Sequence, residues 1–183
     1  MTATSAEGAQ PAGRGGLIVP VPAAELKVEP WMERYLPIWK LGVPAHVTLL
    51  FPFPTLDQLG ASARAELAAR FADTPAITVT FDTVGQFPDV VYLAPEPRDW
   101  FIRQTEALSS HFGLRPYGGL HAEIVPHLTV ARHADPAVQA QIADALRQVV
   151  PIVTSVHEVW LVEEEPSGRW QRAAVFPLGP LAP

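Results

Sequence analysis

Two histidines stand in matching sequence contexts, each followed by a threonine two residues later. The two segments read VPAHVTLLF at positions 43–51 and VPHLTVAR at positions 125–132. On a β-strand, residues two apart project from the same face. His46 with Thr48, and His127 with Thr129, are therefore expected to line a polar surface, while their apolar neighbours anchor each strand in a core.

A pair of imidazoles suits displacement at phosphorus. In-line attack needs a base that takes a proton from the attacking oxygen and an acid that protonates the leaving oxygen on the opposite side. Histidine titrates near neutral pH, so one ring can be neutral while the other is protonated. Threonine hydroxyls can donate to the non-bridging oxygens. The catalytic candidates are therefore His46 and His127, and the phosphate-binding candidates are Thr48 and Thr129, with no metal and no cofactor.

A structural role is the alternative for each of these residues. A strand histidine is often a hydrogen-bonded core residue, and threonine favours strands because it is β-branched. That interpretation explains one motif well, but it leaves the match between two motifs unexplained.

Strand-like and helix-like segments alternate from residue 17 onward, which favours a mixed α/β or α+β domain. Strands are predicted at 17–21, 46–53, 77–81, 90–94, 127–132, 156–162 and 170–176. Helices are predicted at about 29–41, after a capping box that begins at Thr55, around 101–112, and after Asp135. Pro37 is expected to end or kink the first helix. Turns are predicted at 85–89 and 166–168.

The two halves of the chain follow the same order of elements. A step of 81 residues carries His46 onto His127, and the same step carries strand 77–81 onto residues 158–162. Two unrelated α/β stretches of similar rhythm would also give this pattern. A true duplication predicts twofold symmetry, with equivalent strands side by side around one cleft.

Length and composition bound the organisation of the chain. Its 183 residues, 48% hydrophobic and 17% charged, fit one globular domain. Residues 1–16 are small, polar and glycine-rich, so we expect a disordered tail there and a single bilobal domain over 17–183. We expect a monomer.

The sequence contains no cysteine, which excludes disulfides and thiolate metal sites and favours a reducing cytoplasm. Neither a secretory signal pattern nor a membrane-length apolar run is present. The net charge of −6 argues against broad coating of nucleic acid, which depends on many Lys and Arg residues. A small anionic substrate in a local pocket remains compatible with this charge.

The paired motifs resemble those of the two-histidine (2H) phosphoesterase superfamily, and within it the 2′-5′ RNA ligase and RNA 2′,3′-cyclic phosphodiesterase branch. HVTLLF at 46–51 is similar to the first motif of that branch and HLTVAR at 127–132 to the second, and the resemblance covers residues 17–176. It implies a bilobal, pseudo-twofold α+β fold, with antiparallel or mixed sheets lining a central cleft and helices outside. It also implies hydrolysis of a 2′,3′-cyclic phosphate, on an RNA 3′-end or a small nucleotide, to a 2′-phosphomonoester.

The resemblance also implies roles for the matched positions. His127 would be the base that activates water, and His46 the acid that protonates the leaving ribose oxygen. Thr48 and Thr129 would hold the phosphate, and Arg132 matches an arginine that follows the second motif.

Three positions in or beside the motifs depart from the simplest pattern. Arg132 lies an odd number of positions from His127, so its side chain reaches the cleft only if the strand ends or bulges there. Val130 stands where leucine is common in the family, and Ala45 is inserted before the first histidine. Neither of the last two departures removes a reacting group.

Other residues have weaker claims to a function. His121, His127 and His133 could be imagined as metal ligands, but six-residue steps match no familiar zinc site. Four aromatic residues could stack a nucleobase or simply pack: Tyr35, Phe53, Tyr117 and Trp170. The acidic run 163–165 is expected to be a solvated hairpin end.

Two rival functions remain beside hydrolysis. The same acid–base pair could join RNA ends reversibly through a 2′-5′ bond. The chain could also be a module that binds a nucleotide phosphate without turnover. Loss of turnover on replacing either histidine would indicate catalysis, whereas unchanged ligand affinity without turnover would favour the module.

Overall fold

The computed structural model describes residues 14–121 and 123–181. The strands are β1 (Gly15–Pro20), β2 (His46–Phe53), β3 (Pro75–Phe87), β4 (Val90–Glu96), β5 (Leu128–Arg132), β6 (Ile152–Val156), β7 (Glu158–Glu164), β8 (Trp170–Pro177) and β9 (Gly179–Leu181). The helices are α1 (Pro22–Tyr35), α2 (Pro37–Lys40), α3 (Leu56–Ala72), α4 (Arg98–Phe112), the 3₁₀ turn η1 (Pro116–Gly119) and α5 (Pro136–Leu146).

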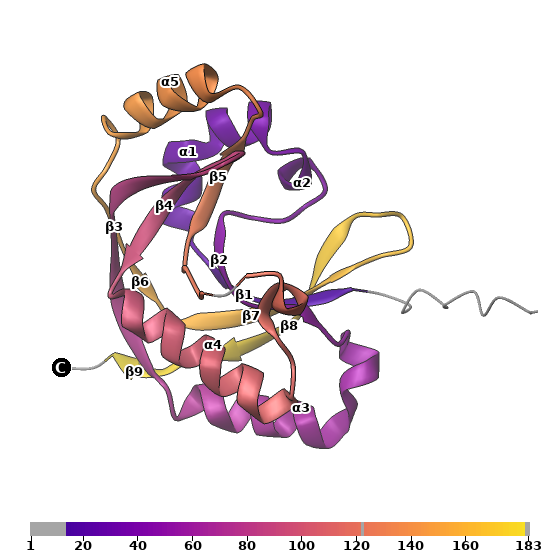
Figure 1. The fold of residues 1–183 in the computed structure, drawn as a ribbon. Helices are drawn as coiled ribbons and strands as arrows, with labels where there is room; N and C mark the ends of the chain where they lie inside the picture. Colours follow the sequence, from indigo (N-terminus) through magenta and orange to yellow (C-terminus); the bar gives the residue numbers. More distant parts are fainter. Residues whose placement is uncertain (1–13, 122, 182–183) are drawn as a thin grey trace, which may run out of the picture.

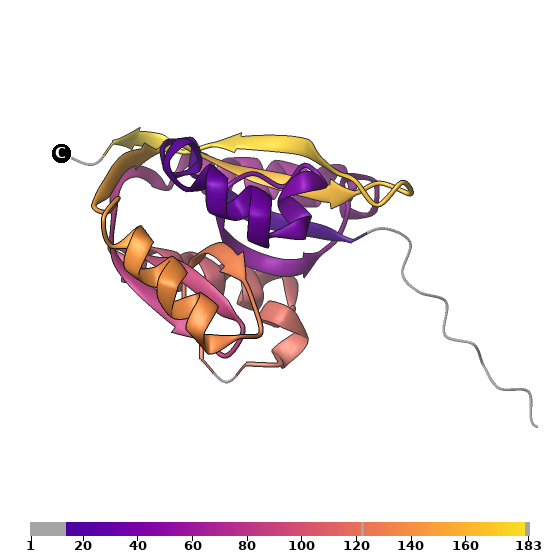
Figure 2. The same ribbon diagram turned by 90° about the horizontal axis from the view of Figure 1, so that it is seen from above.

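One continuous sheet carries the fold, with the strand order β6-β3-β4-β5-β2-β1-β7-β8. All neighbours in this order are antiparallel, and only the short β9 adds a parallel pairing, to β3. The two motif strands, β2 and β5, lie side by side at the centre. The sheet is strongly curled, and the helices lie outside it (Figures 1 and 2). The predicted α+β fold with a duplicated, two-lobed plan is confirmed.

The order of strands is symmetric about the seam between β2 and β5. Outward from the seam, one half runs β5, β4, β3, β6 and the other runs β2, β1, β7, β8. The 81-residue step that relates the two histidines also relates β3 to β7, which occupy equivalent places. The helices cross over reciprocally, because α1 packs against β5 and α4 packs against β2. The sheet order therefore supports a duplication in preference to two unrelated halves.

The apolar residues of the motif strands form part of the core. Val47, Leu49, Leu128 and Val130 are each at most 1% exposed, while the intervening histidines and threonines are half-buried. Burying a side chain of this size contributes about 1.5 to 3 kcal/mol relative to leaving it exposed. This burial fixes which face of each strand points outward, because a one-residue slip would reverse every side chain.

The two helix starts that were predicted from capping residues are confirmed. The backbone N–H of Thr55 donates to Oε1 of Gln58 (2.9 Å), as expected for the capping box that starts α3. The carboxylate of Asp135 accepts from the N–H of Ala137 (2.8 Å) at the start of α5.

Several predicted boundaries were wrong. The first helix begins at Pro22, since proline is tolerated at the first helical position. Strand β3 continues to Phe87, through the turn predicted at 85–89, and β6 was not predicted at all. Strand β1 begins at Gly15, inside the segment expected to be a tail, and residues 1–13 of that segment lie outside the described part of the chain.

None of the helices described is both long and apolar enough to cross a membrane.

Candidate active site

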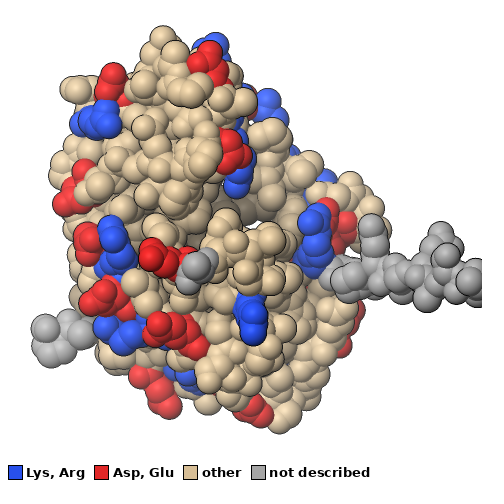
Figure 3. Space-filling view, viewed as in Figure 1, with Lys and Arg blue, Asp and Glu red and all other residues tan. Residues whose placement is uncertain are grey.

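The antiparallel register at the seam brings the two motifs together. Val47 pairs with Leu128, so His46 stands opposite Thr129 and Thr48 stands opposite His127. The four polar side chains thus occupy the corners of a quadrilateral, with the histidines on one diagonal and the threonines on the other. Figure 3 shows the surface hollowed over this region, above η1. The four predicted residues are therefore brought to one place.

Both histidines make the same hydrogen bond to the backbone. Nδ1 of His46 donates to the carbonyl oxygen of Pro44 (2.7 Å), and Nδ1 of His127 donates to that of Val125 (2.8 Å). Because a carbonyl oxygen only accepts, Nδ1 must carry a proton in each ring. Nε2 is then a base when the ring is neutral and an acid when the ring is charged, which is the switch that proton transfer requires.

Burial lowers the pKa of both histidines below the ordinary value. For His46, desolvation outweighs the opposing effect of the Pro44 carbonyl, and the charge of His127 lowers its pKa further. For His127, desolvation is again the largest cause, and the charges of Arg132 and His121 add to it. The two rings are therefore electrostatically coupled, and protonating one disfavours protonating the other.

A β-bulge decides where Arg132 points. Strand β5 has one extra residue between the partners of two adjacent β4 residues, since Val91 pairs with Ala131 and Tyr92 pairs with Thr129. The extra residue is Val130, which is fully buried, and the bulge puts Arg132 on the face that carries Thr129. The guanidinium pairs with the Asp89 carboxylate (2.8 Å) at the turn after β3. The position of Arg132 in the sequence required a bulge or a strand end for its side chain to face the cleft, and the structure has a bulge there.

The same irregularity occurs in the first motif. Leu17 pairs with Leu50 and Ile18 pairs with Thr48, so Leu49 is the bulged residue on β2. Leu49 is 81 residues before Val130, the bulged residue of β5. The position equivalent to Arg132 is then Phe51. The two halves therefore share a β-bulge but differ in the side chain that follows it.

An aromatic wall flanks His127, formed by Phe87 and Tyr92. The two rings stack (4.4 Å between centroids), and both meet the imidazole edge-on at 5.1 and 5.5 Å. Gly85 lies opposite Tyr92 in the sheet, and a Cβ there would overlap the Tyr92 ring. Sequence reasoning missed this wall because Gly85 and Phe87 were assigned to a turn. An apolar-aromatic wall favours the neutral form of the neighbouring histidine.

Tyr117, on η1, covers the first motif. Because η1 packs against β2, the Tyr117 phenol lies near the Thr48 hydroxyl, and its ring meets His121 edge-on at 5.5 Å. The sequence suggested Tyr117 only as an aromatic surface for a base, and gave no sign that it approaches a motif threonine.

The other aromatic candidates lie in ordinary packing contacts. Tyr35 meets His133 edge-on (5.9 Å), Phe53 is 4% exposed and packs on Phe112, and Trp170 packs on Phe51. Among the described residues, no group of three or more His, Cys, Asp or Glu side chains could hold a metal ion.

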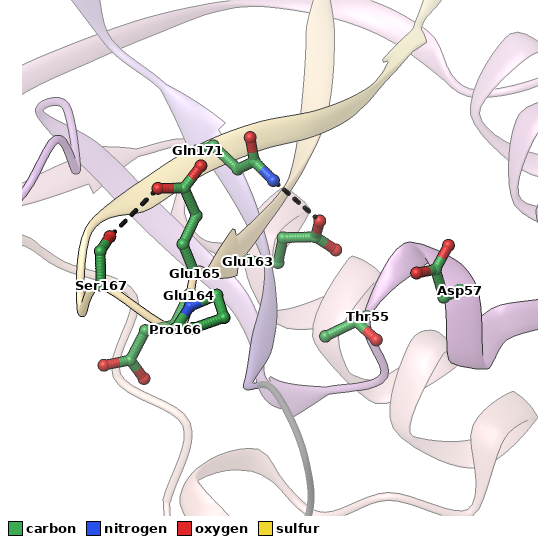
Figure 4. Close-up of a pocket in the computed structure, with 8 residues that line it drawn as sticks. All are labelled: Thr55, Asp57, Glu163, Glu164, Glu165, Pro166, Ser167 and Gln171. Carbon is green, nitrogen blue, oxygen red and sulfur yellow. Dashed lines mark hydrogen bonds between the residues drawn. The ribbon is translucent and has the colours of Figure 1, made fainter.

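The acidic run of the β7–β8 hairpin is not simply solvated, which corrects the expectation. The Glu163 carboxylate accepts from the Leu56 N–H at the start of α3 (3.0 Å) and from Gln171 (3.2 Å), while Glu164 pairs with Arg14 (2.6 Å). Glu163, Glu164 and Gln171 help to line a cavity of about 520 Å³, shown in Figure 4. Its carboxylates repel phosphate, and none of the motif residues lines it.

Solved structures share this fold. Escherichia coli LigT complexed with 3′-AMP superposes with a TM-score of 0.60 at 23% identity, covering 90% of this chain and 97% of LigT. TT0787 of Thermus thermophilus gives a TM-score of 0.56 at 22% identity, with coverage of 90% and 97%. Among curated proteins, "Putative phosphoesterase GK0864" of Geobacillus kaustophilus is 29% identical over 141 residues, which is 75% of this chain and 80% of the relative.

The duplicated fold with paired histidine strands at its seam defines the class as a two-histidine phosphoesterase. The sequence model of the 2′-5′ RNA ligase superfamily matches residues 19–168. The chain belongs to the 2′-5′ RNA ligase superfamily.

Proposed function

We propose that the protein hydrolyses 2′,3′-cyclic phosphates, on RNA 3′-ends or on small nucleotides, to 2′-phosphomonoesters without a metal ion. The observation that carries the proposal is the diagonal arrangement at the seam, with two Nδ1-anchored histidines on one diagonal and two threonines on the other. In-line chemistry needs an acid and a base on opposite sides of phosphorus, and the histidine diagonal matches that need. The name of the Geobacillus relative and the 3′-AMP bound to LigT agree with phosphoester chemistry on a nucleotide.

The reaction can be written with its atoms balanced. Neutral His127 takes a proton at Nε2 from a water molecule, whose oxygen forms a bond to phosphorus. The bond between phosphorus and the ribose 3′ oxygen breaks, and protonated His46 gives its Nε2 proton to that oxygen. The product carries the phosphate on the 2′ oxygen. Exchange of one proton with solvent returns each histidine to its starting state.

The phosphate charge is held by the remaining side chains of the site. Thr48 and Thr129 stand on the second diagonal, so each hydroxyl can donate to one of the two non-bridging oxygens. Arg132 keeps free guanidinium donors beyond the one bound to Asp89. Its charge contributes to attracting the anion.

Chromatography of purified protein with each 2′,3′-cyclic mononucleotide, in EDTA, tests the proposal. We expect wild-type protein to form 2′-monophosphates, and the variants His46→Ala and His127→Ala to lose roughly 10²- to 10⁴-fold in kcat. His157→Ala is the matched control, because His157 is exposed on the loop between β6 and β7, outside the seam.

Three results would contradict the proposal in different ways. Full inhibition by EDTA would indicate a metal-dependent reaction. Unimpaired histidine variants would remove the acid–base scheme. Absence of turnover, with 2′-AMP binding that survives both histidine replacements, would instead favour a binding module. RNA ends bearing 5′-hydroxyl and cyclic phosphate groups, added to the same assay, would reveal 2′-5′ joining as a new product.

A further inference from the structure

The η1 segment adopts an unusual backbone over the first motif. Tyr117 has φ 51° and ψ 32°, and is the one residue other than glycine with positive φ in the described part of the chain. Gly118 and Gly119 follow with φ of 66° and 83°. A left-handed conformation is unfavourable for a residue with a Cβ. Such strain persists only where surrounding contacts hold it, and it is concentrated at functional sites.

The contact that accompanies this strain is polar. The 3₁₀ turn η1 packs against β2, the Tyr117 phenol lies near the hydroxyl of Thr48, and Tyr117 is half-buried. Burial raises the pKa of Tyr117, so its hydroxyl keeps its proton at neutral pH. A hydrogen bond between these two hydroxyls would use one of their two protons and leave the second O–H able to donate. Hydroxyls linked in this way also polarise one another, which strengthens the outer bond.

The pseudo-symmetry shows what the first motif lacks. In the second half, the position after the bulge carries Arg132, whereas in the first half the equivalent position carries Phe51. After Thr48, the polar face of strand β2 therefore carries the apolar Phe51 where β5 carries the cation Arg132. Tyr117 enters from η1 at this corner, and lies close enough to Arg132 for the guanidinium charge to affect it.

We propose that Tyr117 is a substrate-binding residue of the reaction, whose phenol acts with Thr48 to hold one non-bridging oxygen of the cyclic phosphate, while Thr129 serves the other oxygen. This inference rests on the proposed function. It assigns the two non-bridging oxygens to different corners of the seam, so it makes a stereochemical prediction that a purely structural role for Tyr117 does not make.

The test compares Tyr117→Phe with wild type on the two diastereomers of a 2′,3′-cyclic phosphorothioate, alongside the ordinary cyclic nucleotide. Loss of a hydrogen bond to a charged oxygen corresponds to a roughly 10- to 100-fold fall in kcat/KM. We expect that loss with the ordinary substrate and with one diastereomer. It should shrink severalfold with the other, in which sulfur, a weak acceptor, already replaces the contacted oxygen. Thr48→Val should show the same preference, and Thr129→Val the opposite one.

The matched control is Tyr35→Phe, which removes the hydroxyl from a ring that packs edge-on against His133 and belongs to neither motif, and which should leave all rates unchanged. A Tyr117→Phe enzyme with wild-type kcat/KM would overturn the inference, and so would an equal loss with both diastereomers. If wild-type protein turns over no cyclic phosphate, the proposed function fails. Calorimetric binding of 2′-AMP then decides the inference: weaker binding by Tyr117→Phe supports it, and equal affinity or no binding by wild type overturns it.

Discussion

The Nδ1 atoms of both histidines are bound to backbone carbonyls two residues earlier, so the direction of each ring is set by its own strand. The carbonyl bond favours the charged ring, but desolvation favours the neutral ring more strongly, and the net effect lowers the pKa of both groups. Burial alone would also lower the pKa of a single histidine. What distinguishes this pair is that the charge of His127 also lowers the pKa of His46, so the two rings titrate in coupled steps.

A pH–rate profile follows from these pKa shifts. The reaction needs one neutral and one protonated ring, and both pKa values lie below about 6.5, the ordinary value for histidine. We expect kcat/KM for a cyclic mononucleotide to be bell-shaped, with its maximum on the acidic side of about pH 6.5. Because a bound phosphate anion stabilises the charged acid, the kcat profile should be displaced to higher pH. A kcat/KM optimum at about pH 8 or above would contradict this account.

Arg132 offers a test of one cause of the shift. Its positive charge lowers the pKa of His127, so Arg132→Met should raise that pKa and move the acidic limb of the profile to higher pH. Arg98→Met is the control, since Arg98 lies exposed at the start of α4 beside Glu96 and should move neither limb. Unchanged limbs in both variants would show that Arg132 exerts no electrostatic effect on the base.

At the scale of elements, the paired bulges at Leu49 and Val130 shape the site. Each bulge places two consecutive apolar residues in the core and returns the next residue to the polar face. Each strand therefore presents His, Thr and a third residue that lies five positions after the His. Regular alternation would instead have presented the residue four positions after it. The neighbouring strand β4 then contributes Tyr92 to the wall beside His127.

Gly85 is the element-scale position whose replacement we expect to disturb this wall. A Cβ at Gly85 would overlap the Tyr92 ring, so Gly85→Ala must displace a ring that contacts His127. Overpacking of this kind destabilises by about 1 to 3 kcal/mol, and we expect a matching fall in Tm with reduced kcat. The double variant with Tyr92→Leu should recover part of the stability, because the overlap is relieved. An additive double-variant cycle in thermal unfolding would argue against the contact.

At the scale of the whole molecule, duplication produces one site from two half-sites. Each half supplies one histidine, one threonine and one bulge, and the reciprocal packing of α1 on β5 and of α4 on β2 ties the halves together. The halves then differ where chemistry needs an asymmetric site: Arg132 against Phe51, the Phe87–Tyr92 wall on one side, and Tyr117 on the other. The proposed acid and base need different surroundings, and these differences would provide them.

The charge of the whole molecule predicts how substrate length matters. With a net charge of −6 and few cations at the seam, the protein should contact few phosphates. We expect kcat/KM for cyclic-ended oligonucleotides to rise little with length. The logarithm of affinity should fall with the logarithm of salt concentration at a slope of about 1 to 2, measured by fluorescence anisotropy. A steep slope, with affinity that grows over many nucleotides, would indicate an extended RNA-binding surface.

The sequence alone determined the local features. Alternation within VPAHVTLLF and VPHLTVAR was enough to predict the strands and the shared face of His46 with Thr48, because side-chain direction on a strand follows from period two. Two helix starts and the 81-residue repeat were predicted for similar reasons, since capping and periodicity are local.

Only the tertiary structure decided how the parts meet. The register Val47 to Leu128, the bulges that turn Arg132 to the cleft, the Phe87–Tyr92 wall and the approach of Tyr117 to Thr48 all join residues distant in the chain. Such contacts depend on how two apolar faces bury together against α1 and α4, and no single segment encodes that choice. The sequence therefore supplied the candidate reacting groups, and packing across the seam supplied their geometry and the shifts in their pKa values.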